Sequence, residues 1–363
     1  MAGKSFCRNF TFFKRNEMYD YIVVGLGLAG WNLVRVLQAN RKNFVVFEPG
    51  GANSSTASAG VYNPVILKRF TPAWKAAEWL PYALLQYRQY EMEKGKKFVY
   101  PMPIYRKLTS EAEQNDWYAA AGRPVFENYM NGIRREALPG IEAPYGFGVM
   151  KNTGLVDVKG LLDTLAEDLT ARRLLIRERF VHEKLKTKEN YVEYEGIRAR
   201  RIVFAEGYGL KHNPFFGHLP LMGTKGEALT VEPAEKPGGI VKSNVFMAPV
   251  PGSRAYLVGS TYNWTDKSLT PTREAREHLL EKFRGLYQGD FEVTGQRAGI
   301  RPTVKDRRPL LGRHPRHANL FVLNGMGTRG VILAPRSAKI LFDYMEFGMD
   351  LPAEMDIRRF SDG

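Results

Sequence analysis

The hydrophobic pattern starts with an apolar run that ends abruptly in glycines. Residues 19–24 are apolar and rich in β-branched side chains, and a turn with three glycines follows at 25–30. Apolar residues then recur at helical spacing over 31–37, and a second apolar run covers 44–47. Short apolar runs are typical of buried strands, whereas spacings of three and four are typical of helices. The pattern therefore predicts a strand, a tight turn, a helix and a second strand.

Similar alternation continues along the chain. It predicts helices over 70–95, 111–120, 158–173, 272–285 and 331–346, and strands over 98–108, 145–151, 174–181, 191–194, 201–205, 225–231, 244–249, 255–262 and 320–323. Ser110, Asp157 and Thr272 precede three of these helices and are of the types that cap them. Helices alternate with strands at both ends of the chain, which predicts an α/β fold, or α+β when the whole chain is counted.

The length favours two domains, because 363 residues are many for one hydrophobic core. The strand–turn–helix units at the two ends predict one discontinuous domain, and the strand-rich segments between them predict a second domain with an antiparallel sheet. We assign 18–69, 152–215 and 296–363 to the first domain. We assign 70–151 and 216–295 to the second domain.

The N-terminal segment and the cysteine content bear on the setting of the protein. Residues 1–17 are basic and have no apolar core, so we expect a disordered extension, with a basic targeting arm as the alternative. Cys7 is the single cysteine, which excludes a disulfide within the chain and favours a reducing, cytoplasmic setting. No apolar run reaches 18 residues, so we expect no membrane span.

The net charge of +15 allows two interpretations. Residues 296–317 contain seven Lys or Arg against the single acid Asp306, and residues 172–201 contain ten against five Glu. A bound dinucleotide would offset only two charges. One interpretation is a solvated basic surface, and the other is an acidic partner such as tRNA. No RNA-binding motif accompanies the charge.

The first glycine turn carries the pattern of a dinucleotide site. Gly25 permits a sharp turn, Gly27 lets a pyrophosphate approach the backbone, and Gly30 lets the helix pack on the strand. The helix N-terminus favours the phosphates. Glu48 ends the second strand 18 residues after Gly30, where a carboxylate can accept hydrogen bonds from a ribose. The turn leaves open whether the dinucleotide is NAD or FAD.

A second glycine corner lies near the other end of the chain. A strand over 320–323 leads into the turn 324–330, and a helix follows. A second helix N-terminus aimed at the crevice would stabilise the negative charge that develops on a flavin upon reduction. Two such corners favour FAD over NAD.

In combination, the motifs resemble those of the D-amino-acid oxidase-like FAD-dependent oxidoreductases. Within that family the chain resembles glycine oxidase and the oxidase half of the bacterial bifunctional enzyme that modifies tRNA wobble uridine. The resemblance rests on the first corner, Ser58-Ala59-Gly60, Lys225-Gly226-Glu227, Gly299-Ile300-Arg301-Pro302, and the segment from Gly330 to Pro335.

The resemblance implies a discontinuous Rossmann-like FAD-binding domain, an antiparallel-sheet substrate domain and a set of cofactor-binding residues. These residues are Gly25, Gly27, Gly30, Glu48, Ser58, Ala59, Gly60, Val181, Gly207, Gly325, Gly330, Val331 and Ile332. FAD would be bound non-covalently, because no cysteine lies beyond Cys7. We expect no metal site: His314 and His317 are spaced i, i+3, but Pro315 and the nearby arginines disfavour metal binding.

The resemblance also implies the chemistry. Arg301 matches the arginine that binds the substrate carboxylate, and Tyr262 and Arg329 are candidates to shape the pocket. The expected reaction is oxidation of the C–N bond of an amino acid or carboxylate-bearing secondary amine by hydride transfer to flavin. One alternative substrate is the carboxymethylaminomethyl group of tRNA wobble uridine. Another alternative is an amino-acid dehydrogenase that passes electrons to a quinone or carrier.

Overall fold

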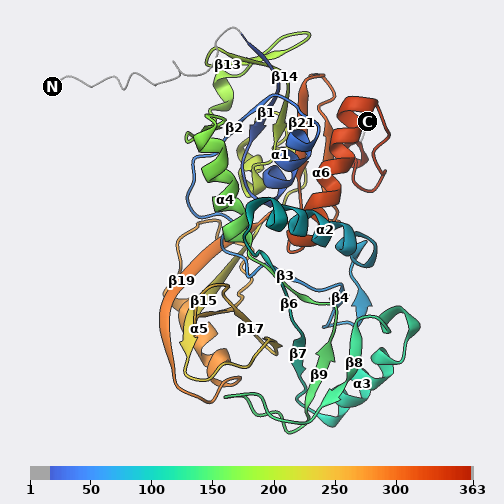
Figure 1. Ribbon diagram of the computed structural model, residues 1–363, viewed down its shortest axis with the longest axis vertical. Coiled ribbons are helices and arrows are strands. Elements are labelled where there is room, and N and C mark those ends of the chain that lie inside the picture. The colour runs from blue at the N-terminus through green and yellow to red at the C-terminus, as the bar shows by residue number, and fades with distance from the viewer. Residues whose placement is uncertain (1–16, 361–363) are drawn as a thin grey trace, which may run out of the picture.

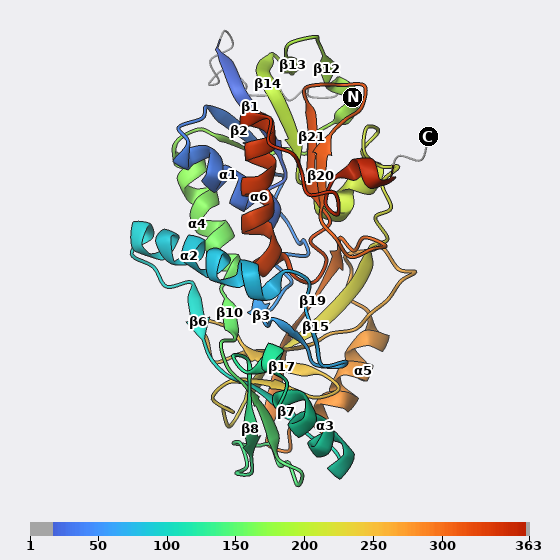
Figure 2. The ribbon, with the colours of Figure 1, turned by 90° about the vertical axis from the view of Figure 1, so that its right-hand side faces the viewer.

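The computed structural model describes residues 17–360. The expected extension at 1–17, apart from Glu17, and Cys7 therefore lie outside the described residues. Figure 1 shows an elongated molecule with one large sheet in each half and helix α2 (Ala76–Lys94) between the halves. The turned view in Figure 2 shows the same division.

The first sheet is built around parallel strands. Its members are β1 (Met18–Val24), β2 (Phe44–Phe47), β11 (Leu175–Ile176), β12 (Lys186–Thr187), β13 (Val192–Tyr194), β14 (Ile197–Phe204), β20 (Leu310–Arg313) and β21 (Leu320–Asn324). The order β11-β2-β1-β14 is parallel throughout, and β21 extends it in parallel beside β14. Strands β12, β13 and β20 pair in the antiparallel sense. Strands β2 and β21 are buried along their whole length, as expected where both faces of a sheet are covered.

Three helices cover one face of this sheet (Figure 2). They are α1 (Leu28–Ala39), α4 (Val158–Ala171) and α6 (Gly330–Phe347). Helix α1 buries Trp31, whose indole N–H donates to the carbonyl of Leu161 on α4 at 3.0 Å. Helix α2 is tied to α6 because the hydroxyl of Tyr87 donates to the carbonyl of Val331 at 2.9 Å.

The second large sheet is antiparallel with one exception. Its order is β19 (Phe291–Arg301), β15 (Thr224–Pro233), β18 (Tyr256–Gly259), β17 (Phe246–Pro249), β16 (Ile240–Lys242), β7 (Ile104–Lys107), β9 (Phe147–Met150) and β8 (Met130–Arg134). Only β16 and β7 run parallel within this sheet. Helix α5 (Arg273–Arg284) packs on β15 and β18, and α3 (Glu111–Ala121) lies beside β8.

Two small sheets lie between the large ones. Strand β10 (Gly154–Val156) pairs with β3 (Val61–Tyr62) and β6 (Val99–Pro101), and β4 (Val65–Ile66) pairs with β5 (Thr71–Pro72). Short 3-10 helices cover 124–126, 182–184, 207–212 and 357–360. None of the described helices is long and apolar enough to cross a membrane.

The sequence predicted most elements but misplaced several boundaries, among them the end of the strand expected at 255–262, which stops at Gly259, and the start of the strand expected at 201–205, which lies at Ile197. Ser110, Asp157 and Thr272 are N-caps, and each side chain accepts a hydrogen bond from the third residue of its helix. The helix expected at 70–95 begins at Ala76, because 71–72 pairs as a strand. The single run expected at 98–108 is two strands in two different sheets, separated by Met102 and Pro103.

Another misplaced boundary is that of the strand expected at 174–181, which is confined to β11. The α/β fold with a second, largely antiparallel sheet is confirmed. The assignment of residues to two domains stays a prediction. Strand β19 runs through residue 296, where the proposed boundary lies.

Candidate cofactor and substrate site

The first glycine corner is shaped by close backbone contacts. Gly25 ends β1 with φ of +98°, a conformation that side chains rarely adopt. A Cβ on Gly30 would lie 1.9 Å from the carbonyl oxygen of Gly25, and a Cβ on Gly25 would lie 2.5 Å from that of Ala205. The two glycines therefore let α1 start directly against the ends of β1 and β14.

The N-terminus of α1 forms an open cradle at this corner. Gly27 is the N-cap of α1 and contributes no side-chain cap to the first turn. A Cβ there would lie 3.1 Å from Oγ of Ser55, the atom that accepts from the N–H of Leu28 at 3.1 Å. Such a terminus is suited to a pyrophosphate.

Glu48 is held beside this cradle at the end of β2. Its Oε2 accepts from the N–H of Leu26 at 2.7 Å, and its Oε1 accepts from the N–H of Gly50 at 3.0 Å. Each carboxylate oxygen keeps a further lone pair for a hydroxyl donor. The carboxylate is thus oriented where a ribose next to the pyrophosphate would lie.

The second glycine corner meets the first. A Cβ on Gly330, the first residue of α6, would lie 3.1 Å from Cδ1 of Leu28 at the start of α1. Gly325 has φ of +77°, and Gly207 has φ of +57°. The carbonyl of Gly207 accepts from Nδ2 of Asn324 at 2.9 Å, which joins the ends of β14 and β21. Val331 and Ile332 follow in the first turn of α6 and are buried.

Residues 53–60 form a loop that connects the two halves. Gly60 packs on β10, where a Cβ would lie 1.9 Å from the carbonyl oxygen of Val156. On the side of the second sheet, Gly299 of β19 packs against the same loop, since a Cβ on Gly299 would lie 2.9 Å from Cβ of Ala57. Nη1 of Arg297 also donates to the carbonyl of Thr56 at 3.3 Å. Ser58 and Ala59 are thereby held between the first corner and the second sheet.

Val181 has internal partners for both backbone polar groups. Its N–H donates to the hydroxyl of Tyr194 at 3.0 Å, and its carbonyl accepts from the N–H of Lys184 at 3.1 Å. A carbonyl oxygen has a second lone pair, but the N–H is used. The role of Val181 toward the adenine stays a prediction.

Arg301 is the last residue of β19, and its guanidinium is held by neutral groups. Nη2 donates to Oγ of Ser260 at 2.7 Å, and Nη1 donates to the carbonyl of Thr261 at 3.4 Å. The guanidinium lies 4.5 Å from the ring centroid of Tyr262. Burial lowers the pKa of Arg301 from its ordinary value, and the charge that Tyr262 can carry opposes this.

Arg329 is brought to the same region by the second corner. The N–H of Gly327 donates to the carbonyl of Pro302 at 3.1 Å, so the turn before Arg329 lies against the residue after Arg301. Nη1 of Arg329 donates to the carbonyl of Asn63 at 3.0 Å. Burial lowers the pKa of Arg329 as well, Tyr262 opposes this, and Arg307 adds to it.

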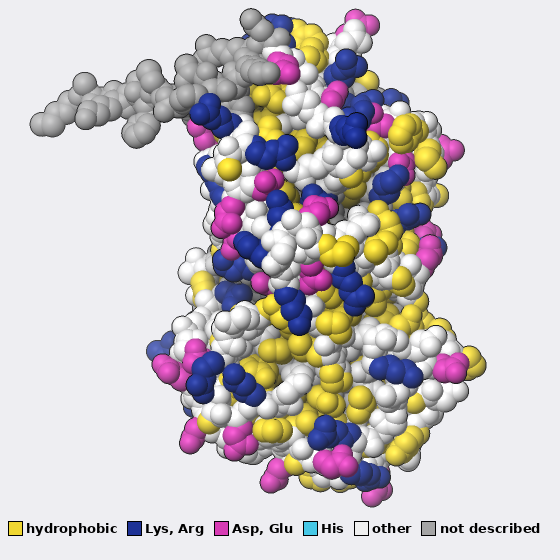
Figure 3. All heavy atoms as spheres, viewed as in Figure 1, with side chains coloured by type: hydrophobic (Ala, Val, Ile, Leu, Met, Phe, Trp, Pro, Cys, Tyr) yellow, Lys and Arg dark blue, Asp and Glu magenta, His cyan; other side chains and the backbone are white. Residues whose placement is uncertain are grey.

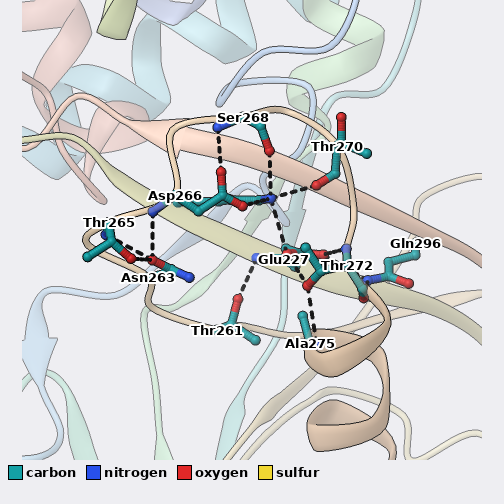
Figure 4. A network of polar contacts seen from close by, with 11 residues as sticks. Glu227, Thr261, Asn263, Thr265, Asp266, Ser268, Thr270, Thr272, Ala275 and Gln296 are labelled. Atoms are coloured by element: carbon teal, nitrogen blue, oxygen red, sulfur yellow. Dashed lines mark hydrogen bonds and ion pairs between the residues drawn. The ribbon is translucent and has the colours of Figure 1, made fainter.

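The charged residues of the motif Lys225-Gly226-Glu227 have a structural role that the sequence did not indicate. Lys225 is fully buried, and its Nζ donates to Oδ2 of Asp266 at 2.5 Å and to the carbonyl of Thr270 at 2.5 Å (Figure 4). Glu227 accepts from the N–H and the hydroxyl of Thr272 at 2.8 and 3.0 Å.

The buried charges of this motif hold the segment that carries the partners of Arg301. The N–H of Thr261 donates to the carbonyl of Glu227, and the N–H of Glu227 donates back to Oγ1 of Thr261 at 2.9 Å (Figure 4). The sequence feature that could have indicated this network is the placement of Lys225 and Glu227 two residues apart in a largely buried strand.

A family model for FAD dependent oxidoreductases matches residues 20–344. The chain belongs to this family. FAD is therefore its cofactor, and it is an oxidoreductase.

Individual relatives agree with this membership. The chain is 25% identical over 346 residues to glycine oxidase of Pseudomonas aeruginosa, covering 89% of this chain and 94% of that protein. It is 21% identical to the tRNA 5-methylaminomethyl-2-thiouridine biosynthesis bifunctional protein of Idiomarina loihiensis, covering 90% of this chain and 56% of that protein. The fold is similar to that of Geobacillus kaustophilus glycine oxidase, with a TM-score of 0.76 and 20% identity, covering 93% and 98% of the two chains.

The residues at the two corners fit FAD. The cradle at Gly27 that a Cβ would narrow would hold the pyrophosphate, the adjoining carboxylate of Glu48 would hold the adenosine ribose, and the N-terminus of α6 would face the flavin. Bound FAD supplies a two-electron acceptor. In residues 17–360, no three His, Cys, Asp or Glu side chains are grouped so that they could hold a metal ion.

Proposed function

We propose that the protein oxidises the C–N bond of an amino acid or of an amine that bears a carboxylate. The observation that carries this proposal is the guanidinium of Arg301, which is partly buried and donates hydrogen bonds to Ser260 and Thr261. No carboxylate of the described chain is paired with it. A desolvated cation without an acidic partner favours binding of an anion.

Arg301 does two things in this proposal. Its remaining N–H donors match the two oxygens of a carboxylate, which fixes the orientation of the substrate as well as its position. The carbon that bears the amine is then directed toward the cofactor rather than toward solvent. Tyr262 stacks on the guanidinium, and 63% of its surface is exposed to solvent.

The relatives support a small amino-acid substrate. Glycine oxidases match nearly the full length of the chain, and the matched segment includes both glycine corners and Arg301. At 25% identity the pocket residues are free to differ. The substrate therefore has to be tested directly.

The test is anaerobic bleaching of the flavin absorbance against a panel of amino acids and N-methyl glycines. Arg301→Lys keeps the charge but loses the paired donors, and we expect kcat/KM for the best substrate to fall at least tenfold. Arg313→Lys, an exposed position of β20, is the matched control. Full activity of the Arg301→Lys variant would refute the carboxylate role.

A second candidate substrate is a tRNA base. It is favoured by Tyr262 and Trp264, which are 63% and 53% exposed, and by the guanidinium of Arg301 over the Tyr262 ring, since exposed aromatic rings beside a cation bind unstacked bases. On the face shown in Figure 3, however, basic side chains are scattered among acidic and neutral ones. Salt-sensitive tRNA binding that Trp264→Ala weakens would support this candidate, and absence of binding at low salt would eliminate it.

The electron acceptor separates an oxidase from a dehydrogenase. Turnover in air with peroxide formed in equal amount to the oxidised amine would support the oxidase. Turnover that requires an added quinone and yields no peroxide would support a dehydrogenase.

A further inference from the structure

Arg301 and Arg329 are two cations that have no acidic partner in the described part of the chain. Both side chains are partly buried, and their hydrogen bonds go to neutral oxygens. The neighbours that perturb their ionisation are Tyr262 and Arg307, and no acid is among them. By contrast, the nearby cations Lys225 and Arg359 are paired with Asp266 and Asp306.

The two arginines come from different elements, and the backbones of the segments that carry them are hydrogen-bonded to each other. Arg301 ends β19 and Arg329 precedes α6, and the hydrogen bond from Gly327 to Pro302 joins these segments. Tyr262 is near enough to both guanidiniums to influence their charge. A partly desolvated cation with no acid beside it favours an anion, so each of the two guanidiniums is suited to a carboxylate.

Both guanidiniums keep donors to spare. An arginine has five N–H donors. Arg301 uses two of them, toward Ser260 and Thr261, and Arg329 uses one, toward Asn63. Each side chain is therefore anchored by its own neighbours and still able to bind a carboxylate at two points.

We propose that the substrate is an amine that carries two carboxylates, one bound by Arg301 and the other by Arg329. This proposal rests on the proposed function and narrows its substrate class. One carboxylate, as in glycine, would satisfy one arginine and leave the other buried without a counter-charge. A second carboxylate satisfies both and adds a charge-assisted hydrogen bond, which corresponds to about 10- to 100-fold in affinity.

The first experiment compares two amines that differ only in the second carboxylate. The holoenzyme is mixed anaerobically with sarcosine or with iminodiacetate, and flavin bleaching is followed. We expect kcat/KM to be at least about tenfold higher for iminodiacetate. In parallel, perturbation of the flavin spectrum measures the Kd of acetate and of malonate, succinate and glutarate, and at least one dicarboxylate should bind about tenfold or more tightly than acetate.

The second experiment removes one cation. Arg329→Gln should lower kcat/KM for iminodiacetate at least tenfold more than it lowers kcat/KM for sarcosine, so the preference for two carboxylates disappears. Arg313→Gln removes one exposed positive charge elsewhere and should preserve the preference. Circular dichroism and the flavin content check that each variant is folded and loaded.

Each other outcome overturns the proposal. Equal kcat/KM for the two amines, together with equal binding of acetate and every dicarboxylate, would show that Arg329 binds no second carboxylate. Equal losses for both amines in Arg329→Gln, with weaker FAD binding, would assign Arg329 to the cofactor. These results leave the proposed function standing. If no amine or amino acid of the full panel bleaches the flavin, both proposals fail together.

Discussion

The guanidinium of Arg301 occupies the space that a side chain on Gly226 would need. A Cβ at position 226 would lie 2.1 Å from Nη2 of Arg301 and 2.4 Å from its Cζ. Gly226 pairs with Gly299 across β15 and β19, two residues before Arg301, so the arginine side chain folds back over the glycine. The glycine in the middle of the Lys-Gly-Glu motif thus sets the position of the guanidinium that we propose binds the substrate carboxylate.

Gly226→Ala should therefore impair substrate binding more than stability. The new Cβ meets the end of a flexible side chain, which can move at little cost to the fold, but the guanidinium then leaves its position. We expect kcat/KM to fall by about 10- to 100-fold, the equivalent of one lost charge-assisted hydrogen bond. Steady-state kinetics with the best substrate and thermal unfolding check both parts.

Gly295→Ala on the neighbouring strand β19 is the control for this substitution, because its Cβ would meet Thr230 at an ordinary 3.7 Å. It should alter neither kinetics nor unfolding by much. A Gly226→Ala variant with unchanged kcat/KM would show that the position of the guanidinium does not limit substrate binding.

The parts of the site that are local in sequence could be predicted, and the parts that depend on distant residues could not. The first corner is encoded within Gly25, Gly27 and Gly30, and the helix caps at Ser110 and Thr272 are equally local. The partners of Arg329 and Lys225 lie 266 and 41 residues away, so no spacing rule identifies them. The same holds for the strand run at 98–108, which two different sheets divide.

Gly27→Ala should weaken FAD binding without unfolding the protein. The added Cβ would lie 3.1 Å from Oγ of Ser55, a tight contact that a small side chain can relieve, but it narrows the cradle at the start of α1. We expect the Kd for FAD to rise at least tenfold, or about 1.4 kcal/mol. Titration of the deflavinated protein with FAD measures this.

The matched control for the cofactor prediction is Gly132→Ala, where a Cβ has open space and φ is not positive. It should retain the wild-type Kd. Unchanged FAD affinity in Gly27→Ala would mean that the pyrophosphate does not approach the backbone at this point.

Lys225→Met should destabilise the protein strongly. The ammonium of Lys225 is fully buried between Asp266, Glu227 and the carbonyl of Thr270, and its loss leaves Glu227 buried without a cation. Removing one partner of a buried ion pair costs about 3–5 kcal/mol. Urea unfolding of the holoenzyme measures the change in the free energy of unfolding.

The control for the buried lysine is Lys236→Met, which changes an exposed lysine and should shift the free energy of unfolding by less than about 0.5 kcal/mol. Proteolysis adds a local measurement, because the segment 263–272 should be cleaved faster in Lys225→Met. Equal stability of the two variants would contradict the role of Lys225 in holding that segment.

His314 should make the stability of the fold depend on pH between about 4 and 6.5. Burial first, and then the nearby charges of His317, Arg316 and His218, lower the pKa of His314 to about 4. Its Nδ1 accepts from the N–H of Arg316 at 3.1 Å, so protonation would also break this hydrogen bond. The unfolded chain, with a pKa near 6.5, binds the proton first, and stability is therefore lost as the pH falls. From pH 6.5 to 5 we expect the free energy of unfolding to fall by about 1–2 kcal/mol.

His314→Gln keeps an acceptor but cannot titrate, so its free energy of unfolding should fall less over this range. Parallel pH profiles for the two proteins in urea unfolding would show that His314 is not responsible.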